Sequence, residues 1–160
     1  MIIVVDGLSS PQVAAFLREH VQEMRSGTPP ESDHSIGIDG LRAPGVTFWS
    51  VWDAGSVVGC GAIKRLDTVH AELKSMRTAP ARKRSGIASR LLEQILTEAK
   101  RMGFTRLSLE TGAGESFSPA RKLYQKYGFE YCAPFAAYEP DPNSVFMTRV
   151  LWARFSRPGF

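Results

Sequence analysis

Residues that build disulfide frameworks or metal sites are scarce in this sequence. Its 160 residues include two cysteines and three histidines. Cys60 and Cys132 lack the spacing of a metal-ligand pair and are too few for a disulfide framework, so we expect two small buried thiols. The histidines are scattered and accompany no nucleophile motif. The sequence therefore predicts no metal site and gives little support to a zinc-dependent or Ser/His/Asp mechanism.

Long apolar runs are also absent. No run approaches the roughly 20 residues that span a bilayer, and the opening MIIVVDGL lacks the basic region and cleavage site of a signal peptide. We therefore expect a cytoplasmic protein with no membrane partner. The content of 43% hydrophobic and 22% charged residues is ordinary for a folded protein. A chain of this length can bury about 68–70% of the surface that it exposes when unfolded. The length predicts a single domain over residues 1–160.

Positive charge is concentrated in one place. The net charge is +4, from 20 basic and 16 acidic residues. The range 74–90 contains six basic residues and no acidic one, namely Lys74, Arg77, Arg82, Lys83, Arg84 and Arg90. Removing these six from the 20 leaves 14 basic against 16 acidic residues. A single patch suits a compact polyanion better than a nucleic-acid duplex, so we expect no nucleic-acid partner.

The basic patch ends where a helix is expected to begin. Between Ile87 and Ala99, apolar residues recur at helical spacing. The turn before them, residues 80–88, combines three consecutive basic residues with small residues such as Ser85 and Gly86. A helix N-terminus offers unpaired backbone N–H groups, and small residues let an anion approach them closely. The turn is a candidate phosphate cradle, and the alternative is a basic helix start that faces water.

Two motifs, in this order, resemble those of the GNAT superfamily of acetyl-CoA-dependent N-acetyltransferases. Residues 83–88, Lys-Arg-Ser-Gly-Ile-Ala, fit the family's pyrophosphate loop, Arg/Gln-x-x-Gly-x-Gly/Ala, except that Lys83 replaces the usual Arg or Gln. Lysine keeps the charge but lacks the planar fork of arginine. Residues 120–129, Ala-x-x-Leu-Tyr-x-x-x-Gly-Phe, resemble the family's later helix-then-strand motif. The resemblance covers roughly residues 48–147 and points to an unassigned bacterial-type branch.

The order of expected elements predicts the class α/β (α+β). Strand-like runs occupy residues 2–5, 46–52, 56–64, 70–78, 105–110, 129–132 and 144–151, helices are expected over 11–26, 87–101 and 116–127, and a short helical turn near 32–36. Leu73 and Met76 are three apart on one strand, so a β-bulge around Lys74 to Met76 is expected to reset the face. The resemblance implies a GNAT-type mixed, mostly antiparallel central sheet, with this bulged strand splayed and helices on both faces.

The resemblance implies direct transfer of an acetyl group from acetyl-CoA, as co-substrate, to a primary amine of a small molecule or protein. An amine with a pKa of about 10.4 is mostly protonated at pH 7, so a base is useful. Glu72 lies at the position where some family members place their base, and Glu110 is the second candidate. Tyr124 occupies the general-acid position. A phenol with a pKa near 10 is better suited to hydrogen-bond a departing thiolate than to transfer its proton fully.

The resemblance also implies which residues bind acetyl-CoA. The bulged strand offers backbone groups to the acetyl-pantetheine arm, while the loop and the helix start bind the pyrophosphate. The residues concerned are Met76, Arg77, Thr78, Lys83, Arg84, Ser85, Gly86, Ile87, Ala88, Ser89 and Phe117. Phe117 departs from the family pattern, because many members have Asn at that position, and a phenyl ring cannot make the amide's contact with the pantetheine arm.

Alternatives remain open at this point. Glu72 could pair with Lys74 or Arg77 in the sheet, and Tyr124 could be a ring packed on its helix. A second class of function is a GNAT-fold module that binds acyl-CoA as a sensor without turnover, although a sensor needs neither Glu72 nor Tyr124. A third is a small basic nucleic-acid-binding domain. The family resemblance implies a monomer or homodimer. It also implies that the irregular segment 28–45 helps to shape the acceptor site, and the alternative is a plain surface loop.

Overall fold

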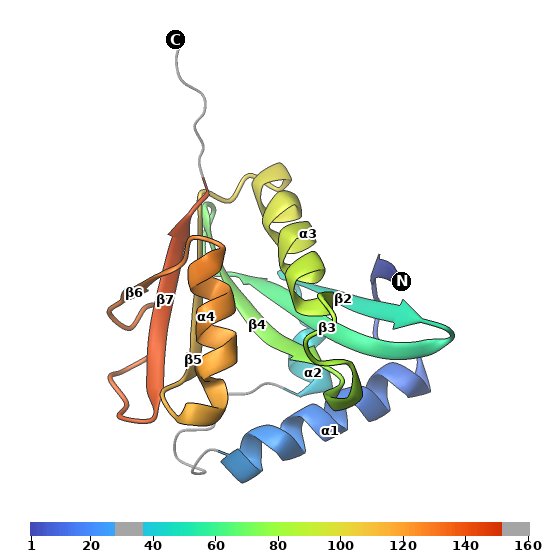
Figure 1. Ribbon diagram of the computed structural model, residues 1–160. Helices are drawn as coiled ribbons and strands as arrows, with labels where there is room; N and C mark the ends of the chain where they lie inside the picture. The colour runs from blue at the N-terminus through green and yellow to red at the C-terminus, as the bar shows by residue number, and fades with distance from the viewer. Residues whose placement is uncertain (28–36, 152–160) are drawn as a thin grey trace. The chain divides into compact units, whose positions relative to one another are not determined.

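The computed structural model describes residues 1–27 and 37–151. Its elements are β1 (Ile2–Val5), α1 (Pro11–Gly27), α2 (Ile38–Leu41), β2 (Val46–Asp53), β3 (Ser56–Arg65), β4 (His70–Thr78), η2 (Pro80–Arg82), α3 (Ile87–Arg101), β5 (Arg106–Gly112), η3 (Glu115–Phe117), α4 (Ser118–Lys126), β6 (Glu130–Cys132) and β7 (Ser144–Val150) (Figure 1). The helical turn predicted near residues 32–36 lies outside the described residues. The chain divides into two compact units, the first made of residues 1–64 and 74–95 and the second of residues 65–73 and those from Leu96 onward.

The first unit contains the strands β1, β2 and β3. β1 pairs with β2 and β2 with β3, both antiparallel, and the second pairing closes at Asp53↔Ser56. The turn between them consists of Ala54 and Gly55, with φ values of 52° and 81°. Two consecutive left-handed residues match the right-handed twist of a hairpin. The strand-like runs predicted over residues 46–52 and 56–64 are therefore joined as a hairpin.

Helix α1 begins where the sequence predicts. The backbone N–H groups of Gln12 and Val13 donate to Ser10 Oγ at 3.2 and 3.4 Å, and Pro11 opens the helix. Ser10 therefore caps the helix N-terminus and Pro11 tolerates the missing bond in the first turn. The helix contributes to a buried cluster made of Leu8, Val13, Phe16, Leu17, Leu41, Phe48, Cys60 and Ala62.

Helix α3 packs on the other side of β3. A Cβ added to Gly59 would lie 3.0 Å from Ile87 Cγ2, and one added to Gly61 would lie 3.1 Å from Ile95 Cδ1. The missing side chains therefore let the helix approach the strand closely. Cys60 lies between the two glycines and belongs to the cluster with α1, and successive residues of a strand face opposite sides. Within the first unit, helices thus cover both faces of the strands, as predicted.

Strand β4 carries the irregularity that the sequence predicts. Ser75 has a φ of 57°, although it lies inside a strand. A left-handed conformation of a non-glycine residue costs about 1 kcal/mol or more. The Cys60 thiol donates a hydrogen bond to the Ser75 carbonyl at 3.1 Å, and so supports this conformation. The break in extended geometry lies within the predicted range 74–76.

The second unit contains the start of β4 with β5, β7 and β6. His70 to Leu73 pair in parallel with β5, β5 pairs antiparallel with β7, and β7 with β6. Figure 1 shows β5, β7 and β6 side by side. One face of this sheet is apolar, with Leu107, Leu109 and Met147 almost fully buried. The opposite face carries polar side chains, because residues of opposite parity alternate along each strand.

The complete strand order is β1-β2-β3-β4-β5-β7-β6. The pairing of β4 with β5 is parallel, and those of β1–β2, β2–β3, β5–β7 and β6–β7 are antiparallel. The predicted mixed, mostly antiparallel α/β class is therefore confirmed, while the splay of β4 and the single domain stay predictions. Two boundaries differ by two residues, since β5 continues to Gly112 and α4 begins at Ser118 after a 3-10 turn, and several others differ by one residue. Within residues 1–27 and 37–151, no helix is long and apolar enough to cross a membrane.

The two cysteines have different surroundings. Both are free thiols. Cys60 is fully buried, and burial raises the pKa of its thiol to about 12. Cys132 is only partly buried, because β6 is the last strand at one edge of the sheet. The prediction of two buried thiols is confirmed for Cys60 and wrong for Cys132.

Candidate functional site

The candidate phosphate cradle lies in the first unit, between η2 and α3. Lys83, Arg84, Ser85 and Gly86 are all exposed. Gly86 has a φ of 85°, and no atom lies within 4 Å of a Cβ placed on it. Arg84 is also left-handed, with a φ of 65°. The chain therefore leaves open space in front of the helix, where a Cβ-bearing residue would be strained.

The first turn of α3 supplies hydrogen-bond donors to this space. Its first backbone bond runs from the N–H of Arg90 to the Gly86 carbonyl at 3.1 Å. The N–H groups of residues 87–89 precede the first intrahelical bond, as at any helix start. They lie at the positive end of the helix dipole, close in sequence to Lys83 and Arg84. Unpaired amides together with two exposed cations are what an anionic pyrophosphate requires.

Arg82, the first of the three consecutive bases, is engaged elsewhere. Its Nη2 donates to Asp53 Oδ2 at 2.6 Å, at the end of the β2–β3 hairpin. The hydrogen bond and charge of Arg82 hold the pKa of Asp53 below its usual value. The Ser85 hydroxyl donates to the Arg82 carbonyl, which fixes the turn. Arg82 therefore anchors the cradle to the hairpin.

The end of β4 holds three of the predicted acetyl-CoA residues, Met76, Arg77 and Thr78. The Arg77 side chain is 4% exposed and its guanidinium binds the Glu23 carboxylate of α1 with two bonds, of 3.1 and 3.0 Å. It also lies 4.3 Å from the centre of the Phe16 ring. The Arg77 side chain is thus part of the packing between α1 and β4. Of Arg77, the backbone groups therefore remain as candidates for binding acetyl-CoA.

Glu72 lies on β4 in the second unit. Its side chain is almost fully buried, with 4% of the residue exposed. The Tyr138 hydroxyl donates to Glu72 Oε2 at 2.5 Å. Tyr138 belongs to the segment between β6 and β7, 66 residues further along the chain. A buried carboxylate with an ordered hydroxyl partner is suited to accept a proton from a substrate.

Further polar groups share the face of the sheet on which Glu72 lies. Glu72 pairs with Ser108, and His70 and Glu110 lie two residues from these partners, on the same face. His70 Nε2 is 2.7 Å from Ser108 Oγ. The Ser144 hydroxyl donates to Glu110 Oε2 at 2.8 Å. Both candidate bases, Glu72 and Glu110, therefore have a hydroxyl donor, but only Glu72 is deeply buried.

The second motif, Leu-Tyr-x-x-x-Gly-Phe, forms the C-terminus of α4. The N–H of Phe129 bonds to the Tyr124 carbonyl and that of Gly128 to the Gln125 carbonyl, both at 3.0 Å, and Gly128 has a φ of 92°. This is the Schellman ending of a helix, in which glycine takes the left-handed position. The rings of Tyr124 and Phe129 meet edge to face at 5.7 Å. The spacing of the motif is therefore explained by helix capping, which also orients Tyr124.

Tyr124 itself is deeply buried, with 7% of the residue exposed. Burial raises the pKa of its hydroxyl well above the usual value for a phenol. The group therefore stays protonated over the whole physiological range. It is suited to donate a hydrogen bond and poorly suited to release its proton.

Phe117 lies in η3, before α4. Its ring covers Gly112, since a Cβ there would lie 2.1 Å from Phe117 Cδ2. Arg121 closes the same turn by donating to the carbonyls of Gly112 and Gly114 at 2.7 and 2.9 Å. Phe117 is therefore a packing residue of the β5–α4 connection as well as a predicted pantetheine contact.

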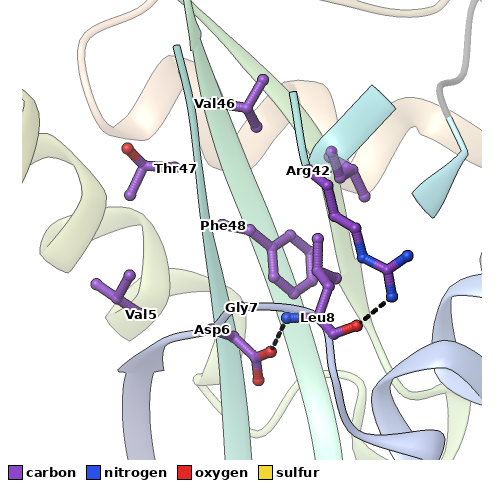
Figure 2. A pocket seen from close by; sticks show the side chains of 9 residues that line it. Val5, Asp6, Gly7, Leu8, Arg42, Val46, Thr47 and Phe48 are labelled. Atoms are coloured by element: carbon purple, nitrogen blue, oxygen red, sulfur yellow. Dashed lines mark hydrogen bonds between the residues drawn. The ribbon is translucent and has the colours of Figure 1, made fainter. Parts of the chain in front are cut away.

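A hollow of about 440 Å³ opens in the first unit beside β1 and β2. It is lined by Val5, Asp6, Gly7, Leu8, Leu41, Arg42, Val46, Thr47 and Phe48. Figure 2 shows Arg42 reaching the Leu8 carbonyl, at 2.5 Å, and the Leu8 N–H bonded to Asp6 Oδ1 at 2.7 Å. None of the predicted site residues lines this hollow, although Leu41 and Arg42 belong to the segment expected to meet the acceptor.

Three partners of the predicted residues were not identifiable from the sequence. They are Tyr138, which binds Glu72, Ser144, which binds Glu110, and Glu23, which binds Arg77. Each lies at least 34 residues from its partner, so no local spacing indicates the contact. Among the described residues, no group of three His, Cys, Asp or Glu could hold a metal ion.

Comparison with known proteins identifies the family. Residues 14–129 match the model of the acetyltransferase (GNAT) family. The chain is 52% identical over 151 residues to an uncharacterized N-acetyltransferase, YsnE, of Bacillus subtilis (strain 168). The aligned region covers 94% of this chain and 100% of that protein.

Solved structures show the same fold. A Klebsiella pneumoniae subsp. pneumoniae MGH 78578 protein, named as an acyl-CoA N-acyltransferase, superposes with a TM-score of 0.74 at 26% identity, over 94% of this chain and 97% of the other. An aminoglycoside 6'-N-acetyltransferase complexed with coenzyme A gives a TM-score of 0.72 at 16% identity, over 98% and 100% of the two chains. The chain therefore belongs to the GNAT family of acetyltransferases and is an acyltransferase enzyme.

Proposed function

We propose that the enzyme transfers an acetyl group from acetyl-CoA to a primary amine of a small molecule or protein, with Glu72 as the base. The observation that carries this proposal is the buried Glu72 carboxylate, 4% exposed and hydrogen-bonded by Tyr138. Carboxylates are common general bases, and the Tyr138 hydroxyl holds this one in a defined orientation.

The cradle in the first unit is the proposed pyrophosphate site of acetyl-CoA. It offers the amides of residues 87–89, the exposed charges of Lys83 and Arg84, and open space at Gly86. A fold neighbour, the aminoglycoside 6'-N-acetyltransferase, is complexed with coenzyme A, which supports the same co-substrate here. Backbone groups of Met76, Arg77 and Thr78 are proposed to bind the pantetheine arm.

An ammonium substrate first loses one proton to Glu72, directly or through water, and becomes a neutral amine. The amine nitrogen then attacks the thioester carbonyl carbon, the C–N bond forms, and the C–S bond breaks when the tetrahedral intermediate collapses. The nitrogen releases its second proton to solvent, Glu72 returns the first proton to solvent, and the departing thiolate of coenzyme A takes one up, so that one proton is released overall. The products are an amide and coenzyme A.

Tyr124 is proposed to assist the departure of the thiolate. Burial raises the pKa of its hydroxyl, so the group donates a hydrogen bond to the developing negative charge on sulfur without transferring its proton fully. The proton that the sulfur takes up then comes from solvent. We further propose that the enzyme works in the cytoplasm as a monomer or homodimer.

The test is a screen of primary amines, both small molecules and peptides with a free amino group. Each is incubated with the enzyme and acetyl-CoA, and release of the coenzyme A thiol is followed with a thiol reagent. We expect thiol release with at least one amine and an acetylated product with a mass increase of one acetyl group. Binding of acetyl-CoA without thiol release for any amine would favour the alternative, a non-catalytic acyl-CoA-binding module of the same fold.

A further inference from the structure

The hydrogen bond between Tyr138 and Glu72 joins the buried carboxylate to the segment between β6 and β7. At 2.5 Å between the two oxygens it is a short bond, of the length found when a hydroxyl donates to an ionised carboxylate. Such bonds favour the charged form of the carboxylate. A base must be in its charged form to accept a proton, so this donor bears directly on the role of Glu72.

The backbone around Tyr138 is built as a tight turn. The N–H of Tyr138 bonds to the Phe135 carbonyl at 3.1 Å, and Ala136 between them has a φ of 53°. A left-handed alanine costs about 1 kcal/mol or more, and such residues persist only where surrounding contacts hold them. The turn therefore keeps Phe135 and Tyr138 together at the expense of local strain.

Aromatic contacts hold the turn against the sheet. The Tyr138 ring lies 5.2 Å from that of Phe135 and 5.5 Å from that of Phe146 on β7. Phe135 in turn lies 5.9 Å from both Phe146 and His70. Edge-to-face and tilted ring pairs of this kind contribute beyond their buried area. The ring of Tyr138 is thus fixed independently of its hydroxyl.

Titratable groups on β4 and β5 act on the hydrogen-bonded pair and on His70 beside it. Glu72 and Glu110 both raise the pKa of Tyr138, after burial, which is the largest cause. His70, on the same strand as Glu72, has its pKa lowered first by burial and then by Arg106 on β5, against the opposite effects of Asp67 and Glu72. Tyr138 therefore remains a protonated donor, and burial favours the neutral form of His70.

We propose that Tyr138 is a positioning residue, whose hydroxyl keeps the Glu72 carboxylate charged and correctly oriented for the transfer reaction. This proposal rests on the proposed function, in which Glu72 is the base. Tyr138 itself exchanges no proton with the substrate. Its effect passes through Glu72, so removing the hydroxyl should change how the reaction depends on pH and leave the handling of acetyl-CoA intact.

The test compares Tyr138→Phe, which keeps the ring and removes the hydroxyl, with Tyr131→Phe, which removes an exposed hydroxyl on β6. For Tyr138→Phe we expect kcat to fall about tenfold. Without the donor the carboxylate protonates more easily, so the acid limb of the pH profile should move to higher pH by about one unit. The KM for acetyl-CoA should stay within about twofold, and Tyr131→Phe should match the wild type.

The dependence on Glu72 is tested by combining variants. In a Glu72→Gln background, Tyr138→Phe should lower kcat by less than about twofold, because there is no carboxylate left to position. A full tenfold loss in both backgrounds would overturn the proposal. So would an acid limb that moves by less than about 0.3 units in a folded Tyr138→Phe protein with an unchanged kcat.

A readout without turnover separates this proposal from the proposed function. Carbon-13 NMR of protein labelled at the Glu carboxyl groups follows the titration of Glu72, whose signal is identified by its loss in Glu72→Gln. We expect the midpoint to move to higher pH by about one unit in Tyr138→Phe and to stay in place in Tyr131→Phe. An unmoved midpoint overturns the positioning role. Absence of thiol release by the wild type overturns the proposed function and leaves this titration valid.

Discussion

The cradle before α3 and the Glu72 site on β4 depend on contacts of very different range. In the cradle, Ser85 bonds to a carbonyl three residues earlier and Gly86 supplies its own left-handed backbone. At the other site, Glu72 is paired with a tyrosine 66 residues away. A cradle made of amides and local turns is encoded in a short motif. A carboxylate whose chemistry depends on a distant hydroxyl is not encoded in any short motif. The two regions should therefore respond differently to substitution.

The largest effect is expected at the distant pair. Glu72→Gln keeps the size of the side chain and removes the base, so kcat should fall about 100-fold, the lower end of what general base catalysis contributes. The stabilisation of the protein by acetyl-CoA should not change, because the cradle residues are untouched. Glu130→Gln, an exposed carboxylate on β6, serves as the control and should keep wild-type turnover. Unchanged turnover of Glu72→Gln at both low and neutral pH would remove Glu72 from the mechanism.

A smaller effect is expected at Tyr124, which belongs to the local helix-ending motif and is also proposed to assist the departure of the thiolate. Tyr124→Phe keeps the ring that packs on Phe129 and removes the hydroxyl. We expect kcat to fall about tenfold through loss of one hydrogen bond to the leaving thiolate, with the melting temperature close to that of the wild type. A loss of less than about threefold would mean that the tyrosine serves only to cap and pack α4.

The smallest effect concerns stability in the first unit. The hydrogen bond from Arg77 holds the pKa of Glu23 below its usual value. The stability that results is present above the ordinary pKa of about 4.3 and is lost as the pH falls through the lowered value. Because the Glu23 side chain is 46% exposed and water screens the pair, Glu23→Gln should cost only about 1 kcal/mol at pH 7.

Urea unfolding at pH 7 and at about pH 3 checks this prediction. The wild type and Glu23→Gln should differ at the higher pH and converge at the lower one. Glu115→Gln, an exposed carboxylate in η3, should show no such difference. If Glu23→Gln were less stable by the same amount at both values, the Arg77–Glu23 ion pair would not be the cause.

Features that depend on neighbouring residues were predictable from the sequence. The Ser10 cap, the Ala54-Gly55 turn and the start of α3 at Ile87 each follow from residues within four positions of one another. The irregular backbone at Ser75 followed from the spacing of Leu73 and Met76. The glycine of the second motif is explained in the same way, because a Schellman ending needs a left-handed residue at that position.

Features that depend on the tertiary fold were not predictable. Nothing near Arg77 indicates that Glu23 neutralises it, and the sequence suggested it for binding acetyl-CoA. Likewise, Tyr138 is one aromatic residue among several in the second half of the chain until β4, β5 and β7 bring Glu72 and Phe146 beside it. The partial exposure of Cys132 was missed for the same reason, since only the strand order shows that β6 lies at an edge.

The most direct test of the account is a thermal-shift titration with acetyl-CoA on four proteins: the wild type, Gly86→Glu, Gly103→Glu and Glu72→Gln. Gly86 and Gly103 both have positive φ and no neighbour within 4 Å of an added Cβ, so the two substitutions impose similar strain. At 100 times its dissociation constant, a ligand adds about 2.7 kcal/mol to stability.

We expect acetyl-CoA to raise the melting temperature of the wild type, Gly103→Glu and Glu72→Gln, and to leave that of Gly86→Glu unchanged, because bulk and negative charge enter the cradle there. No shift in the folded wild type, or an undiminished shift in Gly86→Glu, would contradict this expectation.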